Sequence, residues 1–134
     1  MKLNDDTPML HKDITSQIIN AFYLVYNTLG YGFLEKVYEN AMVHELTKRQ
    51  LQVHQQFPVQ VHYDGVLVGD YFADLVVEGC VIVELKSADG ISEQHKAQLL
   101  NYLKATDIEV GLLLNFGPEP KFVRKIFTED RKRT

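Results

Sequence analysis

The sequence predicts an α/β domain in which helices flank a small mixed sheet, and three observations carry this prediction. Through the first third of the chain, apolar residues recur at the 3.6-residue period of amphipathic helices. Alternating and continuous apolar runs typical of strands follow in the middle. One more helical segment and two short strand-like runs complete the 134 residues, a length typical of one domain. We therefore expect a single domain over residues 1–134, with its core at about residues 14–127.

Two helices are predicted in the first 50 residues. Thr15 or Asp13 can cap the first helix, which should end near Gly30. Its apolar stripe comprises Ile14, Ile18, Ala21, Phe22, Val25 and Leu29. The second helix is expected from about Phe33 to Arg49, with Glu35 in its first turn, where the helix dipole favours negative charge. The predicted apolar face of the second helix is Phe33, Leu34, Val37, Tyr38, Ala41, Met42 and Leu46.

Three strand-like runs come next. The first two, residues 52–63 and 66–77, are joined by Asp64-Gly65, a dipeptide typical of hairpin turns. Pro58 interrupts the first run and indicates an edge strand or a bulge, because proline cannot donate a ladder hydrogen bond. The third run, residues 81–87, is largely apolar and follows the second after a short loop.

The last third of the chain predicts a helix between strands. Ser92 can cap a helix that runs to about Ala105. Residues 109–115 are an apolar run typical of a buried strand, and residues 121–127 alternate as a final edge strand would. This order of elements describes helices packed around a mixed sheet.

Three charged residues stand inside two otherwise apolar strands: Asp74 in the second, Glu84 and Lys86 in the third. Because burying an unpaired charge is costly, this placement calls for an explanation. If residues 78–80 form a three-residue loop, Asp74 and Glu84 face each other with Cβ atoms roughly 5 Å apart. A two-residue loop would instead separate the two acids across the sheet.

Two interpretations of this cluster stay open. Two carboxylates at that distance repel each other, and a divalent cation between them removes the repulsion. Oxygen ligands favour Mg²⁺ or Mn²⁺ over Zn²⁺, which prefers His and Cys. In the alternative interpretation, Lys86 pairs with Asp74 or Glu84 in a salt-bridge network. The metal site is favoured, because one lysine leaves one of the two acids uncompensated.

The predicted third helix carries Gln98 and Tyr102 one turn apart on the same face, with His95 on a neighbouring position. His95 is either a ligand or, more commonly for a lone histidine, a surface or capping residue. Asp74, then Glu84-x-Lys86, then a helix with Gln98 and Tyr102 resembles the core of the PD-(D/E)XK nuclease superfamily. The segment Gly32-Phe33-Leu34-Glu35-Lys36-Val37-Tyr38 is similar to that of its small GxxExxY protein family.

This sequence departs from the superfamily pattern before its first acid. The residue preceding Asp74 is Ala73 rather than proline, a substitution that is frequent in the superfamily. Phe72 stands where many relatives carry a basic residue, and this difference either reduces the contacts to phosphate or has no consequence.

The resemblance implies a restriction-endonuclease-like core, with a central four-stranded mixed sheet flanked by helices. It also implies metal-dependent hydrolysis of phosphodiester bonds in nucleic acid, DNA rather than RNA. Asp74 and Glu84 would bind Mg²⁺ or Mn²⁺ with the Leu85 backbone carbonyl, and Glu35 would complete the metal site. Lys86 would orient the attacking water and stabilise charge at phosphorus.

The remaining implied roles belong to Gln98 and Tyr102, which would position the substrate or other active-site residues. The alternative is a non-catalytic metal-binding or regulatory module that retains the nuclease fold. The formal net charge of −4 favours this alternative, since phosphate contacts need clustered Lys and Arg. A homo-oligomer or a protein partner also stays open.

Sequence features also bear on the cellular compartment. A single cysteine, Cys80, excludes an internal disulfide and fits a reducing compartment. The chain has no apolar run near the ~18 residues of a transmembrane helix and no signal-peptide pattern. We therefore expect a cytoplasmic protein that does not associate with membranes.

Overall fold

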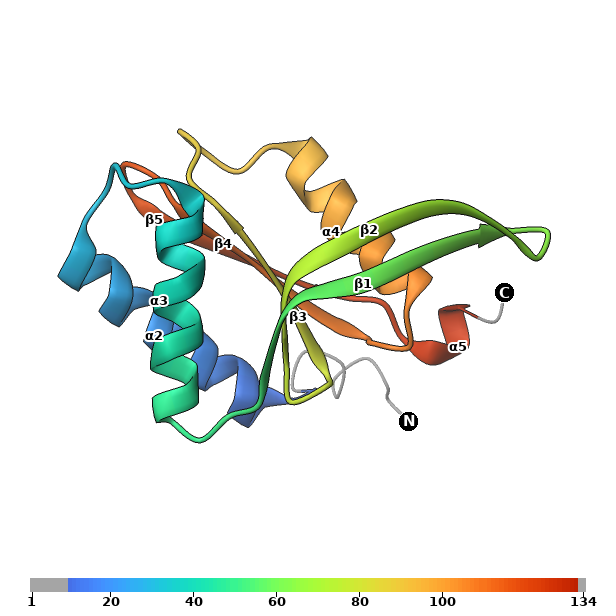
Figure 1. Ribbon diagram of the computed structural model, residues 1–134, viewed down its shortest axis with the longest axis horizontal. Coiled ribbons are helices and arrows are strands. Elements are labelled where there is room, and N and C mark those ends of the chain that lie inside the picture. The colour runs from blue at the N-terminus through green and yellow to red at the C-terminus, as the bar shows by residue number, and fades with distance from the viewer. Residues whose placement is uncertain (1–9, 133–134) are drawn as a thin grey trace.

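The computed structural model describes residues 10–132 and shows helices on both faces of one twisted sheet (Figure 1). The ends of the predicted domain of residues 1–134 lie outside the described residues. The elements, in chain order, are α2 (Lys12–Leu29), α3 (Glu35–Lys48), β1 (Val53–Tyr63), β2 (Val66–Val77), β3 (Val81–Lys86), α4 (Glu93–Ala105), β4 (Val110–Phe116), β5 (Pro120–Ile126) and α5 (Glu129–Lys132). No helix within residues 10–132 is both long enough and apolar enough to cross a membrane.

The sheet is mixed, as predicted, but it has five strands in the order β1-β2-β3-β4-β5. Only the β3–β4 pair is parallel, because α4 forms the crossover between these two strands. The expectation of four strands is wrong: after a short turn, β5 folds back along β4 from Phe116↔Pro120 to Val110↔Ile126. The alternating pattern of residues 121–127 had indicated this edge strand. At the other edge lies β1, which accommodates Pro58 as predicted.

Two apolar clusters fill the two faces of the sheet. On one face α2 and α3 pack against Val81, Val83 and Leu85 of β3, together with the equivalent face of β4. On the other face α4 packs through Leu99 and Leu103 onto Ile82 and its neighbours. Because β3 and β4 are covered on both faces, their sequences are continuous apolar runs that do not alternate. A charged residue in β3 is therefore unusual and informative.

The first helix differs at its start from the prediction. Its N-cap residue is His11, which makes no side-chain capping hydrogen bond. The Thr15 hydroxyl donates to the Lys12 carbonyl inside the helix, so neither Thr15 nor Asp13 is the cap. The helix begins before its apolar stripe does, and it ends as predicted at Gly30.

The apolar face of α3 begins later than predicted. Tyr38, Met42 and Leu46 are fully buried, whereas Leu34 is 79% exposed, and Phe33 and Val37 are also exposed. Phe33 and Leu34 precede the first helical residue, Glu35, and lie on a loop outside the core, whereas Val37 belongs to the first turn of the helix and is exposed there.

The cap of α4 confirms the role expected for Ser92 and resolves that of His95. The Ser92 hydroxyl accepts the His95 backbone N–H at 3.1 Å, and His95 Nδ1 accepts the Ser92 backbone N–H at 3.1 Å. This reciprocal pair is a capping box with histidine in the place of the usual Glu or Gln. His95 is thus a capping residue, and its Nδ1 is occupied by the backbone.

Candidate active site

The β2–β3 hairpin sets the register of the two acids. Residues 78–80 form the three-residue loop on which the prediction depended, and the Cys80 N–H donates to the Val77 carbonyl at 3.1 Å. The strands pair from Val77↔Val81 to Leu75↔Val83. Extending this register by one residue places Asp74 opposite Glu84.

Beyond the last paired residues of β2 and β3, the two carboxylates accept backbone N–H groups of the opposite strand. The Glu84 carboxylate accepts the Asp74 backbone N–H at 2.7 Å, and the Asp74 carboxylate accepts the Leu85 backbone N–H at 2.8 Å. Glu84 is only 3% exposed, and Asp74 is half-buried. The two acids therefore lie together where the paired strands separate.

The surroundings of this pair disfavour its ionised form. Burial raises the pKa of Glu84 to about 8, and the negative charge of Asp74 contributes in the same direction. Burial also raises the pKa of Asp74, although the hydrogen bond from Leu85 and the charge of Lys86 oppose the shift. A divalent cation at this position would favour the ionised carboxylates, so the pair is suited to bind one.

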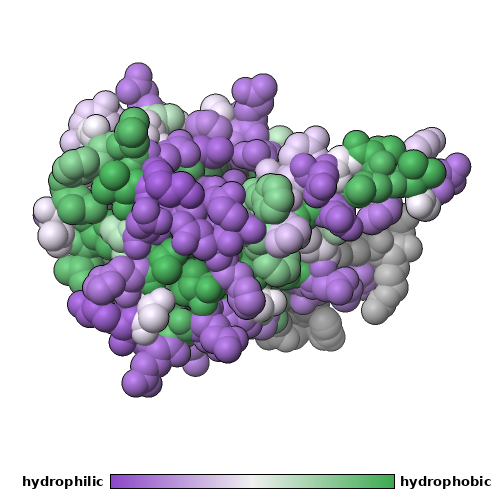
Figure 2. Space-filling view, in the orientation of Figure 1, coloured by the Kyte–Doolittle hydropathy of each residue, from purple (hydrophilic) through white to green (hydrophobic). Residues whose placement is uncertain are grey.

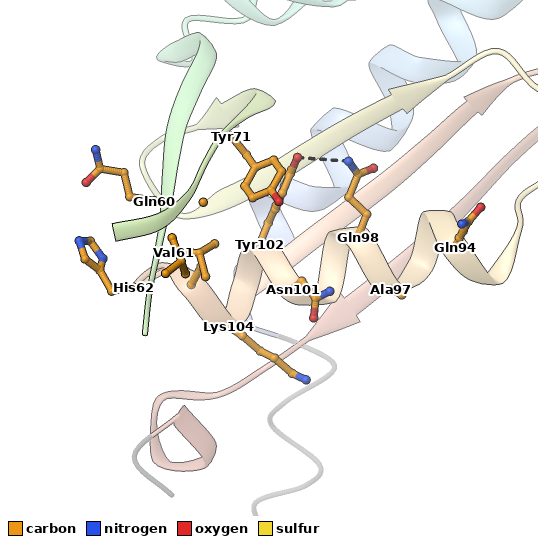
Figure 3. Close-up of a pocket in the computed structure, with 13 residues that line it drawn as sticks. Gln60, Val61, His62, Tyr71, Gln94, Ala97, Gln98, Asn101, Tyr102 and Lys104 are labelled. Atoms are coloured by element: carbon orange, nitrogen blue, oxygen red, sulfur yellow. Dashed lines mark hydrogen bonds between the residues drawn. The ribbon is translucent and has the colours of Figure 1, made fainter. Parts of the chain in front are cut away.

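Lys86, two residues after Glu84, is hydrogen-bonded to α4. Its Nζ donates to Gln98 Oε1 at 3.2 Å. Gln98 Nε2 in turn donates to the Tyr102 hydroxyl at 3.1 Å (Figure 3). Within residues 10–132, no ion pair joins Lys86 to Asp74 or Glu84, which contradicts the salt-bridge interpretation.

The hydroxyl at the end of this chain of hydrogen bonds stays protonated over a wide pH range. Burial raises the pKa of Tyr102, and the nearby charge of Glu84 raises it further. The structure thus brings together Lys86, Gln98 and Tyr102, three of the residues that the sequence singled out.

A buried asparagine fixes the path between β3 and α4. Asn115 is fully buried and lies beside Lys86 in the β3–β4 register. Its amide accepts the Ala88 N–H at 2.9 Å and donates to the Ala88 carbonyl at 3.0 Å. Gly117 lets this loop approach closely, because a Cβ there would lie 2.1 Å from the Ala88 oxygen. Asn115 was not predicted as a site residue, although it is the polar residue that interrupts the apolar run of β4.

Glu35 reaches the end of β3 from the start of α3. Its carboxylate accepts the Ser87 backbone N–H at 3.3 Å, and its charge contributes to the raised pKa of Asp74. The turn before it depends on Gly32, whose φ of 117° suits glycine. Tyr38 holds this turn: its hydroxyl donates to the Gly30 carbonyl at 2.6 Å and accepts the Phe33 N–H at 3.2 Å.

Glu39 is a site residue that sequence reasoning missed. It is 5% exposed, and its charge raises the pKa of both Asp74 and Glu84. Its position one helical turn after Glu35 was the available signal. Three side chains donate to its Oε2: Gln55 Nε2 at 2.6 Å, Gln56 Nε2 at 3.0 Å and Lys36 Nζ at 3.1 Å.

The donor set fits a hard cation. Within the described residues, no three or more His, Cys, Asp or Glu side chains form a group that could hold a metal. Mg²⁺ does not require such a group, because it commonly binds through one or two carboxylates and completes its shell with waters and substrate phosphates. Asp74 and Glu84 supply two carboxylates without a soft ligand, a set that suits Mg²⁺ or Mn²⁺.

A mixed sheet with an acid pair and a lysine on two adjacent inner strands is typical of nuclease-like α/β domains. The chain belongs to the PD-(D/E)XK nuclease superfamily, whose family model matches residues 12–126. Members of this superfamily generally depend on divalent metals and act on nucleic acids.

Among solved structures, the fold is similar to the crystal structure of SSO0001, with a TM-score of 0.56 and 16% sequence identity. The match covers 73% of this chain and 53% of that chain, so this chain spans about half the length of its structural relative. No curated protein matches the chain.

Proposed function

We propose that the protein is a metal-dependent nuclease that hydrolyses phosphodiester bonds, in DNA rather than RNA. The observation that carries the proposal is the buried acid pair next to Lys86, whose ionisation is disfavoured and which is hydrogen-bonded to the backbone where the β2–β3 pairing ends. Such perturbed carboxyl groups in a polar cluster are typical of functional sites.

The metal ligands would be Asp74, Glu84 and the Leu85 backbone carbonyl, and Glu35 of α3 would complete the site through a coordinated water and not as a direct third carboxylate ligand. A bound Mg²⁺ or Mn²⁺ supplies Lewis acidity and lowers the pKa of a coordinated water. In the reaction a bond forms between the water oxygen and phosphorus, the ester P–O bond breaks, and the leaving oxygen takes up a proton.

Lys86 would stabilise negative charge on the phosphoryl oxygens and orient the attacking water. Its hydrogen bond to Gln98 limits the positions that a flexible ammonium can adopt. Gln98 and Tyr102 would act as positioning residues, since Tyr102 supports the amide that accepts from Lys86.

We also assign the chain to the GxxExxY group of this superfamily. The support is that all three residues of the motif have a defined structural part. Gly32 and Tyr38 shape and hold the turn, and Glu35 extends from the turn to the end of β3.

The decisive experiment is cleavage of single- and double-stranded DNA and RNA with Mg²⁺ or Mn²⁺, compared with EDTA. Lys86→Met removes the ammonium but keeps an unbranched chain of similar length, and we expect it to abolish cleavage. Lys48→Met is the matched control, because Lys48 is an exposed lysine on α3. Metal-dependent cleavage that is equal in the wild type and Lys86→Met would contradict the proposed mechanism.

A non-catalytic binding module that keeps the metal site is the second candidate. The observation in its favour is an apolar surface at the end of the β1–β2 hairpin, where Val66, Leu67 and Val68 are exposed (Figure 2). Metal binding without cleavage of any substrate in the panel would support this module over the nuclease.

A further inference from the structure

A groove runs from the candidate active site along α4. It has a volume of about 840 Å³ and lies between the β1–β2 hairpin and the helix. Gln98 and Tyr102 line it, so it is continuous with the hydrogen-bond chain that ends at Lys86. Figure 3 shows hairpin residues such as His62 and Tyr71 on one wall and helix residues such as Asn101 on the other.

The groove exists because the hairpin bends over α4. Ala73 and Val76 both pack on the α4 side, so the alternation of β2 breaks at Asp74. On β1, Gln56 has a left-handed φ of 58° between the paired residues Gln55↔Leu75 and Phe57↔Ala73. The same irregularity therefore places Asp74 and directs the hairpin over the helix.

The lining of the groove is suited to a nucleic-acid strand. The described residues that line it include no Asp or Glu, although the chain has 18 of them. Lys104 and His62 supply positive charge or donors for phosphate. Three further side-chain amides, those of Gln60, Gln94 and Asn101, can bind phosphate oxygens or base edges.

An aromatic surface lies in the middle of the groove. Tyr71 is 50% exposed, and its ring centroid lies 6.1 Å from that of Tyr102. Gly69 makes room for the Tyr71 ring, because a Cβ at Gly69 would lie 2.8 Å from a ring carbon. The ring is thus placed over the backbone of its own strand with part of its surface open to a ligand.

We propose that this groove binds a single, unpaired strand of nucleic acid and leads it to the active site. The inference rests on the proposed nuclease function and names its substrate class. An aromatic ring stacks on a base only when the base is unpaired or splayed out, and such stacking tolerates any sequence. A duplex would instead be held through many phosphate contacts, for which Lys104 and His62 are too few.

The test measures binding without turnover. The full chain is titrated in EDTA into a fluorescein-labelled oligo-dT strand and, separately, into a duplex of mixed sequence, and anisotropy is recorded. We expect the single strand to bind more tightly. Tyr71→Leu, which keeps an apolar side chain but removes the ring, should weaken this binding about 10-fold, and Tyr71→Phe should retain it.

Two further variants check the charge and the location. Lys104→Gln should weaken strand binding and reduce the magnitude of the slope of log K against log salt by about 0.7, the value for one phosphate contact on a single strand. Tyr63→Leu is the control, because Tyr63 is an exposed tyrosine of the same hairpin that does not line the groove. Its strand affinity should equal that of the wild type.

The proposal is overturned if the duplex binds as tightly as the strand, if Tyr71→Leu binds like the wild type, or if no strand binding is measured at about 100 µM protein. These results are separable from a failure of the nuclease function. If the protein cleaves nucleic acid but Tyr71→Leu binds the strand like the wild type, the strand-binding groove is contradicted and the nuclease function is supported. If strand binding depends on Tyr71 but no substrate is cleaved, the nuclease function is contradicted and the groove is supported.

Discussion

Asp74 and Glu84 each hold the backbone of the other's strand: Glu84 accepts the Asp74 N–H at 2.7 Å, and Asp74 accepts the Leu85 N–H at 2.8 Å. The two acids are therefore part of the fold as well as the candidate site. A substitution at either position can change stability and activity together, so a loss of cleavage in such a variant is informative only beside its free energy of unfolding.

The first prediction concerns the pH dependence of stability in the absence of metal. The pKa of Glu84 is about 8 in the folded protein and near 4.5 in the unfolded chain. Between these values the folded state holds a proton that the unfolded state has lost, so the free energy of unfolding should fall as pH rises. The contribution of Glu84 is complete below pH 4.5 and is lost by about pH 8, with a slope of up to about 1.4 kcal/mol per pH unit.

Urea unfolding in EDTA at several pH values measures this slope. Glu84→Gln keeps a neutral side chain that can accept the Asp74 N–H, so it should flatten the profile and be more stable than the wild type at pH 8. Glu119→Gln, an exposed control on the β4–β5 turn, should follow the wild type. If the free energy of unfolding depends on pH in the same way in the wild type and in Glu84→Gln, the buried Glu84 carboxyl is not the cause of the pH dependence.

The second prediction concerns metal binding. Mn²⁺ should raise the melting temperature at pH 8, by an amount equivalent to about 2.7 kcal/mol when its concentration is 100 times the Kd. The increase should be smaller at pH 5.5, because the ion must displace the proton on Glu84. Differential scanning fluorimetry with and without EDTA measures both. Asp74→Asn should lose the metal-dependent increase, and an unchanged increase would exclude Asp74 as a ligand.

The third prediction concerns the link between Lys86 and α4. Gln98→Leu removes the acceptor for Lys86 and the donor to Tyr102, so it should lower kcat about 10- to 100-fold, as loss of a supporting hydrogen bond typically does. KM should change less, because the ammonium is displaced and not removed. Steady-state cleavage kinetics test this, with Glu93→Gln on the same helix as the control. A wild-type kcat for Gln98→Leu would show that Lys86 needs no such support.

The fourth prediction concerns the loop between β3 and α4. Asn115→Ala leaves both backbone groups of Ala88 without their side-chain partner, which should destabilise the protein by about 1–3 kcal/mol. Asn27→Ala, an exposed asparagine on α2, should change stability by less than about 0.5 kcal/mol. Urea unfolding of the two variants provides the comparison. Equal effects would mean that the buried amide contributes nothing specific.

Much of the fold could be predicted because local patterns determine it. The bounds of β2 agree with the alternating run of residues 66–77, and the Gly30 and Ser92 signals mark the ends of helices as expected. The register of Asp74 and Glu84 followed from the length of one loop. The superfamily resemblance implied four strands, whereas the local alternation of residues 121–127 indicated the fifth.

The missed features depend on contacts between distant segments. Glu39 reads as an ordinary helix residue, and only its packing against Gln55 and Gln56 of β1 shows that it is buried beside the acids. The groove requires a left-handed backbone at Gln56, a residue type that gives no such signal. Neither feature has a period or a spacing that a sequence pattern could reveal.

The short separation of the acid pair in the chain has a consequence for the rate of folding. Asp74 and Glu84 are joined by a hairpin with a three-residue turn, and contacts of such low sequence separation form within microseconds and often early. If this hairpin is formed in the transition state, the repulsion between the acids opposes folding before the remaining sheet has assembled. We therefore expect refolding to be faster at low pH, where both acids carry their protons, and slower once they ionise. The protonation state of Asp74 and Glu84 would then set the refolding rate, which stopped-flow refolding at several pH values measures; a Glu84→Gln variant with the same pH dependence as the wild type would contradict this.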